Sequence, residues 1–155
     1  MSQLRERSTY STRPLPDEAV LGEDGRAGAT ASVLRSLGAV AVLVVGAVHL
    51  QQYLGAGFDS VHVIGKLFLL NFVGATVIGL GLLVPVARLR SLHALLAIGG
   101  IGLAGTSFVF LFVSEHMSLF GFQEHGYRAA IVVALVAEAI AVVALSAYLV
   151  IRRRG

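Results

Sequence analysis

Long apolar runs separated by short polar segments dominate the chain after a polar start. Each run is long enough for an α-helix that crosses the roughly 30 Å hydrocarbon core of a bilayer. The pattern predicts four membrane-spanning helices, at about residues 36–53, 65–86, 92–114 and 129–151. Pro85 is expected to end or bend the second helix. We therefore predict an all-α fold, in which residues 31–155 form an antiparallel four-helix transmembrane bundle.

Residues 1–30 differ from the rest of the chain in composition. They are rich in Ser, Thr, Gly, Pro and charges of both signs, and they have no apolar periodicity. Such a segment buries too little apolar surface to fold alone, so we predict a disordered cytoplasmic tail. The tail could serve as a docking or phosphorylation segment. The simpler interpretation is a solvated tail whose arginines hold the N-terminus in the cytoplasm.

The composition places the chain in the membrane class. Apolar residues make up 56% of the 155 residues and charged residues 14%, and the mean hydropathy is +0.82. The chain has no cysteine, which excludes disulfides, thiolate metal sites, CxxC redox pairs and cysteine nucleophiles. The net charge of +3 could indicate a nucleic-acid partner, but the arginines flank apolar runs or lie in the tail. The expected partner is therefore the lipid bilayer and not nucleic acid.

The arginines also predict the orientation of the bundle. The opposite face carries only Lys66 and Arg128 next to the spans. Because Lys and Arg concentrate on the cytoplasmic side, both termini are expected there, with loops 54–64 and 115–127 outside the cell membrane. A multi-pass protein of this kind could also contact another membrane protein or a second copy of itself. The arginines on the predicted cytoplasmic side are Arg5, Arg7, Arg13, Arg26, Arg35, Arg88, Arg90, Arg152, Arg153 and Arg154.

Glu138 is the most unusual residue of the spans, because a carboxylate at the centre of a membrane helix costs about 2.5–3.5 kcal/mol. A rise of about 1.5 Å per residue places Glu138 roughly 21 Å from Arg152, and His49 roughly 21 Å from Arg35. Three further polar residues lie roughly 24–25 Å from the arginines of their own spans. The polar groups that share this level are His49, Asn71, Thr106, Ser107 and Glu138.

Polar groups at this depth normally face the interior of a bundle, since lipid offers them no hydrogen bonds. We therefore predict a polar pocket in the outward half of the membrane. His49 and Glu138 are the pair with the clearest chemistry: a neutral imidazole can donate to a carboxyl group, and proton transfer would create an ion pair. The five residues are thus candidates for ligand binding or proton exchange. An interhelical hydrogen-bond cluster without chemistry is the alternative interpretation.

Further histidines and carboxylates lie in or near the outer loops. Histidine with carboxylate can bind zinc or copper, although no established ligand spacing is present, and a pair of solvated Glu-His dipeptides explains the loop equally well. Haem held between His49 and His116 is another possible cofactor. The metal-ligand candidates are His62, Glu115, His116, Glu124 and His125.

Three segments carry a family resemblance: GAVHL (46–50), GKLFLLNFVGA (65–75) and LFGFQEHGYR (119–128). They resemble small four-span bacterial integral membrane proteins of unassigned function. The resemblance implies the fold and the membrane location, and it supplies no catalytic residues.

No nucleophile elbow, Walker sequence, HExxH motif or dinucleotide fingerprint occurs in the chain, so nothing in it supports catalysis. The favoured function is a non-enzymatic membrane protein that binds a partner or small ligand in its outward half. The alternatives are a proton- or metal-coupled transport component and a haem- or quinone-binding redox subunit. The glycines of the third span, Gly99, Gly100, Gly102 and Gly105, are predicted to allow close helix packing.

Overall fold

The computed structural model describes residues 18–55, 57–60, 62–85, 90–117 and 129–154, which are almost all helical, with no β-strand among them. A short 3-10 turn, η1, follows the first helix. The elements are α1 (Glu18–Gly55), η1 (Phe58–Ser60), α2 (His62–Leu83), α3 (Arg90–His116) and α4 (Ala129–Arg154).

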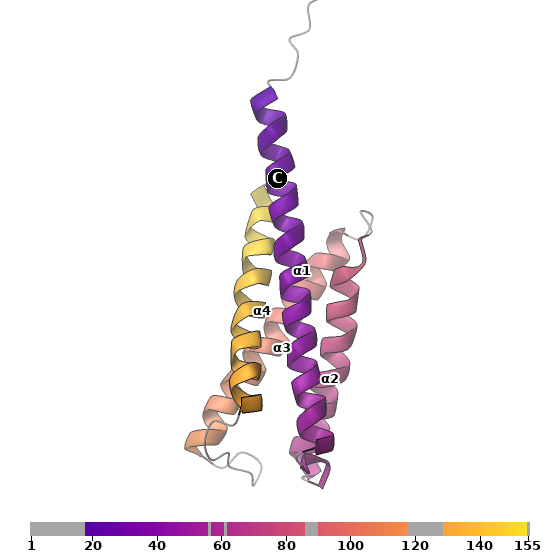
Figure 1. Cartoon of the computed structure of the whole chain (residues 1–155), viewed down its shortest axis with the longest axis vertical. Helices are drawn as coiled ribbons and strands as arrows, with labels where there is room; N and C mark the ends of the chain where they lie inside the picture. Colours follow the sequence, from indigo (N-terminus) through magenta and orange to yellow (C-terminus); the bar gives the residue numbers. More distant parts are fainter. Residues whose placement is uncertain (1–17, 56, 61, 86–89, 118–128, 155) are drawn as a thin grey trace, which may run out of the picture.

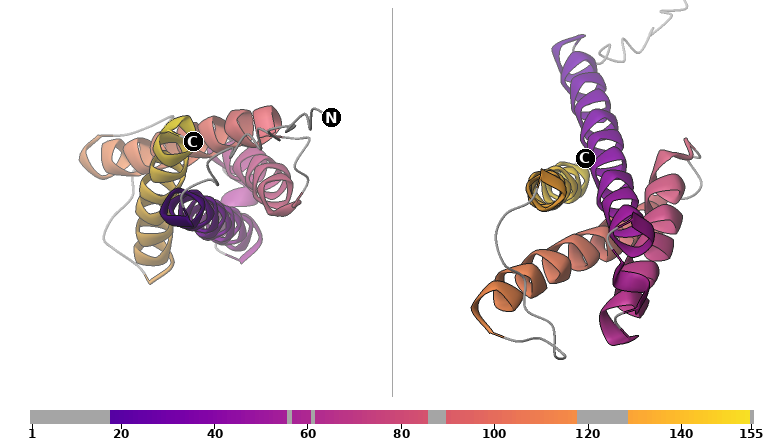
Figure 2. Two further views of the ribbon diagram at one scale, coloured as in Figure 1. Left: turned by 90° about the horizontal axis from the view of Figure 1, so that it is seen from above. Right: turned by 60° about the horizontal axis from the view of Figure 1, so that its bottom comes forward.

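The four long helices run antiparallel in succession, as Figure 1 shows. Helix α1 packs between α4 and α2, and α3 closes the other side by packing against α4 and α2. Helix α3 is tilted across the bundle, so that its beginning lies beside α2 and its end lies beneath the start of α4 (Figures 1 and 2). Helices α2 and α3 therefore diverge toward the end of the bundle that contains η1.

Each of the four helices contains a stretch long and apolar enough to cross a membrane. Large apolar side chains point away from the bundle, including Val143 at 69% exposure and Leu70 at 67%. Apolar side chains on the outer surface are expected where the surroundings are lipid tails. The described part of the chain is thus a multi-pass membrane protein, with candidate spans Gly25–Gly55, Val63–Leu83, Ser91–Ser114 and Ala129–Arg153.

The predicted four-helix fold is confirmed, and α2 ends at Leu83, shortly before Pro85. The tail prediction is wrong for residues 18–30, which form the first turns of α1. This segment contains the good helix formers Ala, Leu, Glu and Arg, and it extends a helix whose costly nucleus the span has already formed. Residues 25–30 are exposed, so this part of the extension forms without burying an apolar face. Residues 1–17 lie outside the described residues.

The tightest packing lies in the half of the bundle that contains Arg35 and Arg152, which we call the arginine half. An added Cβ at Gly38 would lie 2.6 Å from Leu145 Cγ, and one at Gly79 would lie 3.1 Å from the backbone oxygen of Ala39. These glycines therefore let α1 approach α4 and α2 closely. The buried apolar cluster comprises Ala39, Ala41, Val42, Ala75, Leu82, Ala97, Ala104, Ala141, Leu145 and Tyr148.

The α3 glycines behave in two ways. A Cβ at Gly100 would meet Leu145 at 2.8 Å, and one at Gly99 would make ordinary contact with Ile78. A Cβ added at Gly102 or Gly105 would meet nothing within 4 Å, so the prediction that these two glycines allow close packing is wrong. Neighbouring positions of α3 make the packing contacts instead, since Ala104 is fully buried and Leu103 would lie 3.1 Å from a Cβ at Gly74, whereas Gly102 is exposed.

Candidate functional site

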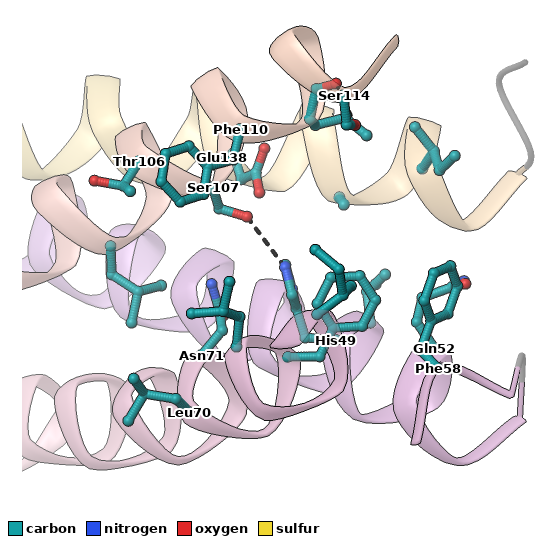
Figure 3. Close-up of a pocket in the computed structure, with 18 of the residues that line it drawn as sticks. His49, Gln52, Phe58, Leu70, Asn71, Thr106, Ser107, Phe110, Ser114 and Glu138 are labelled. Atoms are coloured by element: carbon teal, nitrogen blue, oxygen red, sulfur yellow. Dashed lines mark hydrogen bonds between the residues drawn. The ribbon is translucent and has the colours of Figure 1, made fainter. Parts of the chain in front are cut away.

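A cavity of about 420 Å³ lies in the half of the bundle opposite the arginine half, and all four helices contribute to it. We call this half the cavity half. Its walls are mainly apolar, with side chains such as Val48, Ile64, Leu67, Phe68 and Leu103. Figure 3 shows polar side chains from the different helices gathered within these walls. They are His49, Gln52, Asn71, Thr106, Ser107, Ser114 and Glu138.

The structure brings the five predicted site residues to this one cavity. His49 comes from α1, Asn71 from α2, Thr106 and Ser107 from α3, and Glu138 from α4. Thr106 is exposed at the edge, whereas Ser107 and Glu138 lie further inside. The depth estimate therefore selected residues that share a cavity, and their functional role stays a prediction.

The ring of His49 is held from three directions. Its Nδ1 lies 2.8 Å from the carbonyl oxygen of Val45, one turn earlier on α1, and its Nε2 lies 3.1 Å from Ser107 Oγ. Phe68 meets the ring edge-on, with the centroids 5.1 Å apart and the planes at 85°. Because a carbonyl oxygen can only accept, the neutral ring carries its hydrogen on Nδ1. Its Nε2 then accepts the hydroxyl hydrogen of Ser107.

Glu138 is 1% exposed and is one of the largest fully buried side chains among the described residues. Ser107, which bonds His49 at 3.1 Å, also lies close enough to the Glu138 carboxyl group to interact with it electrostatically. Figure 3 shows the Ser107 hydroxyl directed at the His49 ring, with the Glu138 carboxyl group nearby. The direct bond from the imidazole to the carboxyl that the sequence suggested is not formed, because both ring nitrogens already have other partners.

Three buried side-chain oxygens have no hydrogen-bond partner among the described residues: Gln52 Oε1, Asn71 Oδ1 and Glu138 Oε2. All three residues line the cavity. The amide nitrogen of Gln52 is engaged, since it donates to Gln51 Oε1 at 2.9 Å. A buried acceptor without a donor costs roughly 1–3 kcal/mol, so three of them around one cavity require an explanation.

Two polar lining residues, Gln52 and Ser114, were not among the predicted site residues. Gln52 follows His49 by three positions, and Ser114 follows Ser107 by seven, so each pair shares one face of its helix. This spacing could have identified them. Depth alone could not, because both lie closer to the ends of their helices than the predicted layer.

The cavity borders the surface between α2 and α3. Its lining includes Leu70 on α2 at 67% exposure and Phe110 on α3 at 41%, together with exposed Gly102 and Thr106. These residues belong to the outer surface that faces lipid in a membrane. The cavity therefore reaches the outer surface through exposed lining residues of α2 and α3.

The structure does not place His116 in the cavity that holds His49. His116 is exposed, its Nδ1 lies 2.8 Å from the carbonyl oxygen of Phe112, and its ring stacks on that of Phe112. Within the described residues no group of three or more His, Cys, Asp or Glu side chains could hold a metal. The side chains of His62 and Glu115, and all of Glu124 and His125, lie outside the described part.

In comparisons with protein-family models, curated proteins and solved structures, nothing matches the chain. The resemblance to four-span bacterial membrane proteins therefore stays a prediction.

Proposed function

We propose that this membrane protein binds a small, mainly apolar molecule with a polar head in the cavity, without chemical conversion of that molecule. The observation that carries the proposal is the cavity of about 420 Å³ with apolar walls and the converging polar groups of His49, Asn71, Ser107 and Glu138. Ligand sites are typically concave, mostly apolar and equipped with a few polar groups that fix orientation. The volume is within the usual range of about 300–1,000 Å³.

The sideways opening supports entry from the bilayer. Leu70 and Phe110 line the cavity and the outer surface together, so an apolar molecule dissolved in lipid can reach the cavity between α2 and α3. The polar groups lie deeper, toward α1 and α4. A ligand with an apolar chain and one polar end matches this distribution.

A matched pair of glycine substitutions tests the binding of a ligand. Gly102 lines the cavity and Gly105 does not, and an added carbon meets nothing within 4 Å at either position. Gly102→Leu is therefore expected to fill cavity space, while Gly105→Leu adds the same side chain one turn later. Both variants should fold, since an added Cβ meets nothing within 4 Å at either position.

The measurement is mass spectrometry of small molecules that remain with the protein after purification in native lipid. The expected result is a molecule retained by the original protein and by Gly105→Leu but lost from Gly102→Leu. Equal retention by both variants, or no retained molecule in any of them, would overturn the proposal.

Proton exchange through the site is the second candidate, and the order Glu138, Ser107, His49 favours it. A protonated Glu138 can donate to Ser107, whose own hydrogen goes to His49 Nε2. In the alternative state, an imidazolium donates from Nε2 to Ser107, and Ser107 donates to the carboxylate. Both states satisfy the same three groups, so a proton can pass between Glu138 and His49 without rearrangement of the helices.

The outward position of the cavity follows from the predicted orientation, which single cysteines can test because the chain has none of its own. Cysteines at Ser60 and Ser118 are expected to react with an impermeant thiol reagent in intact cells. A cysteine at Ser2 is expected to react only after lysis. If only the cysteine at position 2 is labelled in intact cells, the orientation is the reverse of the predicted one.

A further inference from the structure

We propose that the head of the bound molecule is a protonated amine, a cation with N–H donors, which binds at the carboxyl group of Glu138. This inference rests on the proposed binding function and names the class of ligand. It follows from the kind of polar atom that the cavity leaves without a partner and from the charges near it.

The first step concerns hydrogen-bond direction. The unpartnered buried atoms around the cavity, Gln52 Oε1, Asn71 Oδ1 and Glu138 Oε2, are all oxygens that accept hydrogen bonds. Two of the donors beside them are already used: Ser107 bonds His49, and the Gln52 amide bonds Gln51. A ligand that satisfies this set must therefore bring donors. A quinone carbonyl or a carboxylate would bring further acceptors, which this arrangement does not favour.

The second step concerns charge. The cavity lining contains Glu138 and no lysine or arginine. An ionised carboxylate that is 1% exposed needs a partner of opposite charge, because an unpaired buried charge is strongly unfavourable. Among the lining residues only His49 can become cationic, and in its neutral form it supplies no charge. An ammonium group provides the missing charge and up to three donors in one head.

The third step concerns the rest of the ligand. Apolar side chains from all four helices surround the polar end, including Leu67, Leu111 and Ile131. The rings of Phe58 and Phe68 lie 5.0 Å apart beside His49, and such faces attract a cation as well as an alkyl chain. A primary amine on a medium-length alkyl chain fits all of these features.

Four nonyl probes separate the contributions of charge and donors: nonylamine, nonyltrimethylammonium, nonanol and nonanoate. The first two share the charge and the chain, and only nonylamine has N–H donors. Thermal unfolding of the full chain in lipid nanodiscs would be followed as each probe is titrated. Nonylamine is expected to raise Tm at a concentration about tenfold below that needed for the other three probes. A tenfold difference in affinity corresponds to the free energy of about one hydrogen bond to a charged group.

Two variants locate the effect. Glu138→Gln is expected to remove the advantage of nonylamine over nonanol, because an amide carries no charge. Glu23→Gln is the matched control, since Glu23 precedes the spanning segment Gly25–Gly55, and it should leave the advantage unchanged. Asn71→Leu gives a second test that keeps the acid, and it should weaken nonylamine more than nonanol.

The outcomes distinguish this inference from the function on which it rests. Equal effects of all four probes, each abolished by Gly102→Leu, would keep the binding cavity and overturn the amine assignment. Equal effects of nonylamine and nonyltrimethylammonium, both lost in Glu138→Gln, would overturn the role of the N–H donors. Failure of Gly102→Leu to reduce the effect of any probe would overturn the binding function itself.

Discussion

The two halves of the bundle treat buried polar groups differently. In the arginine half, His93 Nε2 donates to the carbonyl oxygen of Val84 at 3.0 Å, and His93 Nδ1 accepts from Arg35 Nη1 at 3.3 Å. Arg35 also reaches the Val84 oxygen, at 3.4 Å. The end of α2 is thereby tied to α1 and α3. In the cavity half, by contrast, the three partnerless oxygens surround the cavity.

Packing follows the same division. Close glycine contacts occur at Gly38, Gly79 and Gly100, and also at Gly46 against Ala75 one turn before His49, whereas Gly102 and Gly105 have open space. One half therefore holds the helices together through packing and satisfied hydrogen bonds. The other half gives up contacts and hydrogen bonds around a cavity. The arginine half shows that this bundle can provide hydrogen-bond partners for its buried polar groups. The unpartnered oxygens of the cavity half therefore support a binding role for that half.

The largest expected effect comes from the packed half. Leu145 is fully buried against Gly38 and Gly100, so Leu145→Ala should lower the free energy of unfolding by about 2–5 kcal/mol. Leu111→Ala is the matched change in the cavity half and should cost about 1 kcal/mol, because Leu111 already borders open space. Thermal unfolding in one detergent measures both. Equal losses would contradict the division into a packed half and an open half.

A smaller effect is expected from two alanine substitutions of glycine. At Gly79 an added methyl group would lie 2.5 Å from Leu43 Cγ and 3.1 Å from a backbone oxygen, so Gly79→Ala should destabilise the bundle by about 1–3 kcal/mol. At Gly102 nothing lies within 4 Å, and Gly102→Ala should be neutral or stabilise by up to about 1 kcal/mol through helix propensity. The sign of the change in Tm at each position checks the comparison.

The positions of the spans could be predicted because the bilayer fixes the length of an apolar helix and arginines mark its ends. The beginning of α1 could not be predicted in this way. Residues 25–30 are exposed and bury no apolar face. The compositional argument for disorder therefore missed a helix that continues from a span. Helix propensity and continuity with the span determine whether such a segment is helical, and burial does not.

The level of the polar residues could also be predicted, because helix rise is nearly constant. Depth does not give the rotation of each helix about its axis or the order of contacts. It therefore placed Thr106 and Ser107 together, although Thr106 is exposed at the edge and Ser107 bonds His49 inside the cavity. These details depend on how α3 crosses the bundle, which short apolar sequences do not specify.

Substitution of Glu138 can show whether this acid is functional or structural, with only a small expected change in stability. Under the proton-exchange proposal, Glu138→Gln should keep the fold but abolish proton exchange, since an amide cannot ionise. His49→Gln should cause a similar loss, and the double variant should be no worse than either single variant because the groups act as one unit. Proton uptake by proteoliposomes containing a pH-sensitive dye measures this.

Ser107→Ala should also stop the exchange, because it removes the hydroxyl between the two groups. Ser114→Ala is its control on the same face of α3 and should retain exchange. If Glu138→Gln retains both stability and exchange, while Glu138→Leu lowers stability, the acid acts only as a hydrogen-bonding strut.

The smallest effect is expected from the segment that belongs to neither half. Removal of residues 1–30 should leave Tm in detergent nearly unchanged, because residues 25–30 are exposed and the packed part of α1 begins at Ala31 and Leu34. A longer deletion, through residue 34, is the control: it removes Ala31 and Leu34, which pack against the buried cluster, and should lower Tm. Both truncated chains would carry a new initiating Met. A large fall in Tm after the shorter deletion alone would show that the first thirty residues dock on the bundle, which would extend the stabilising contacts beyond the arginine half.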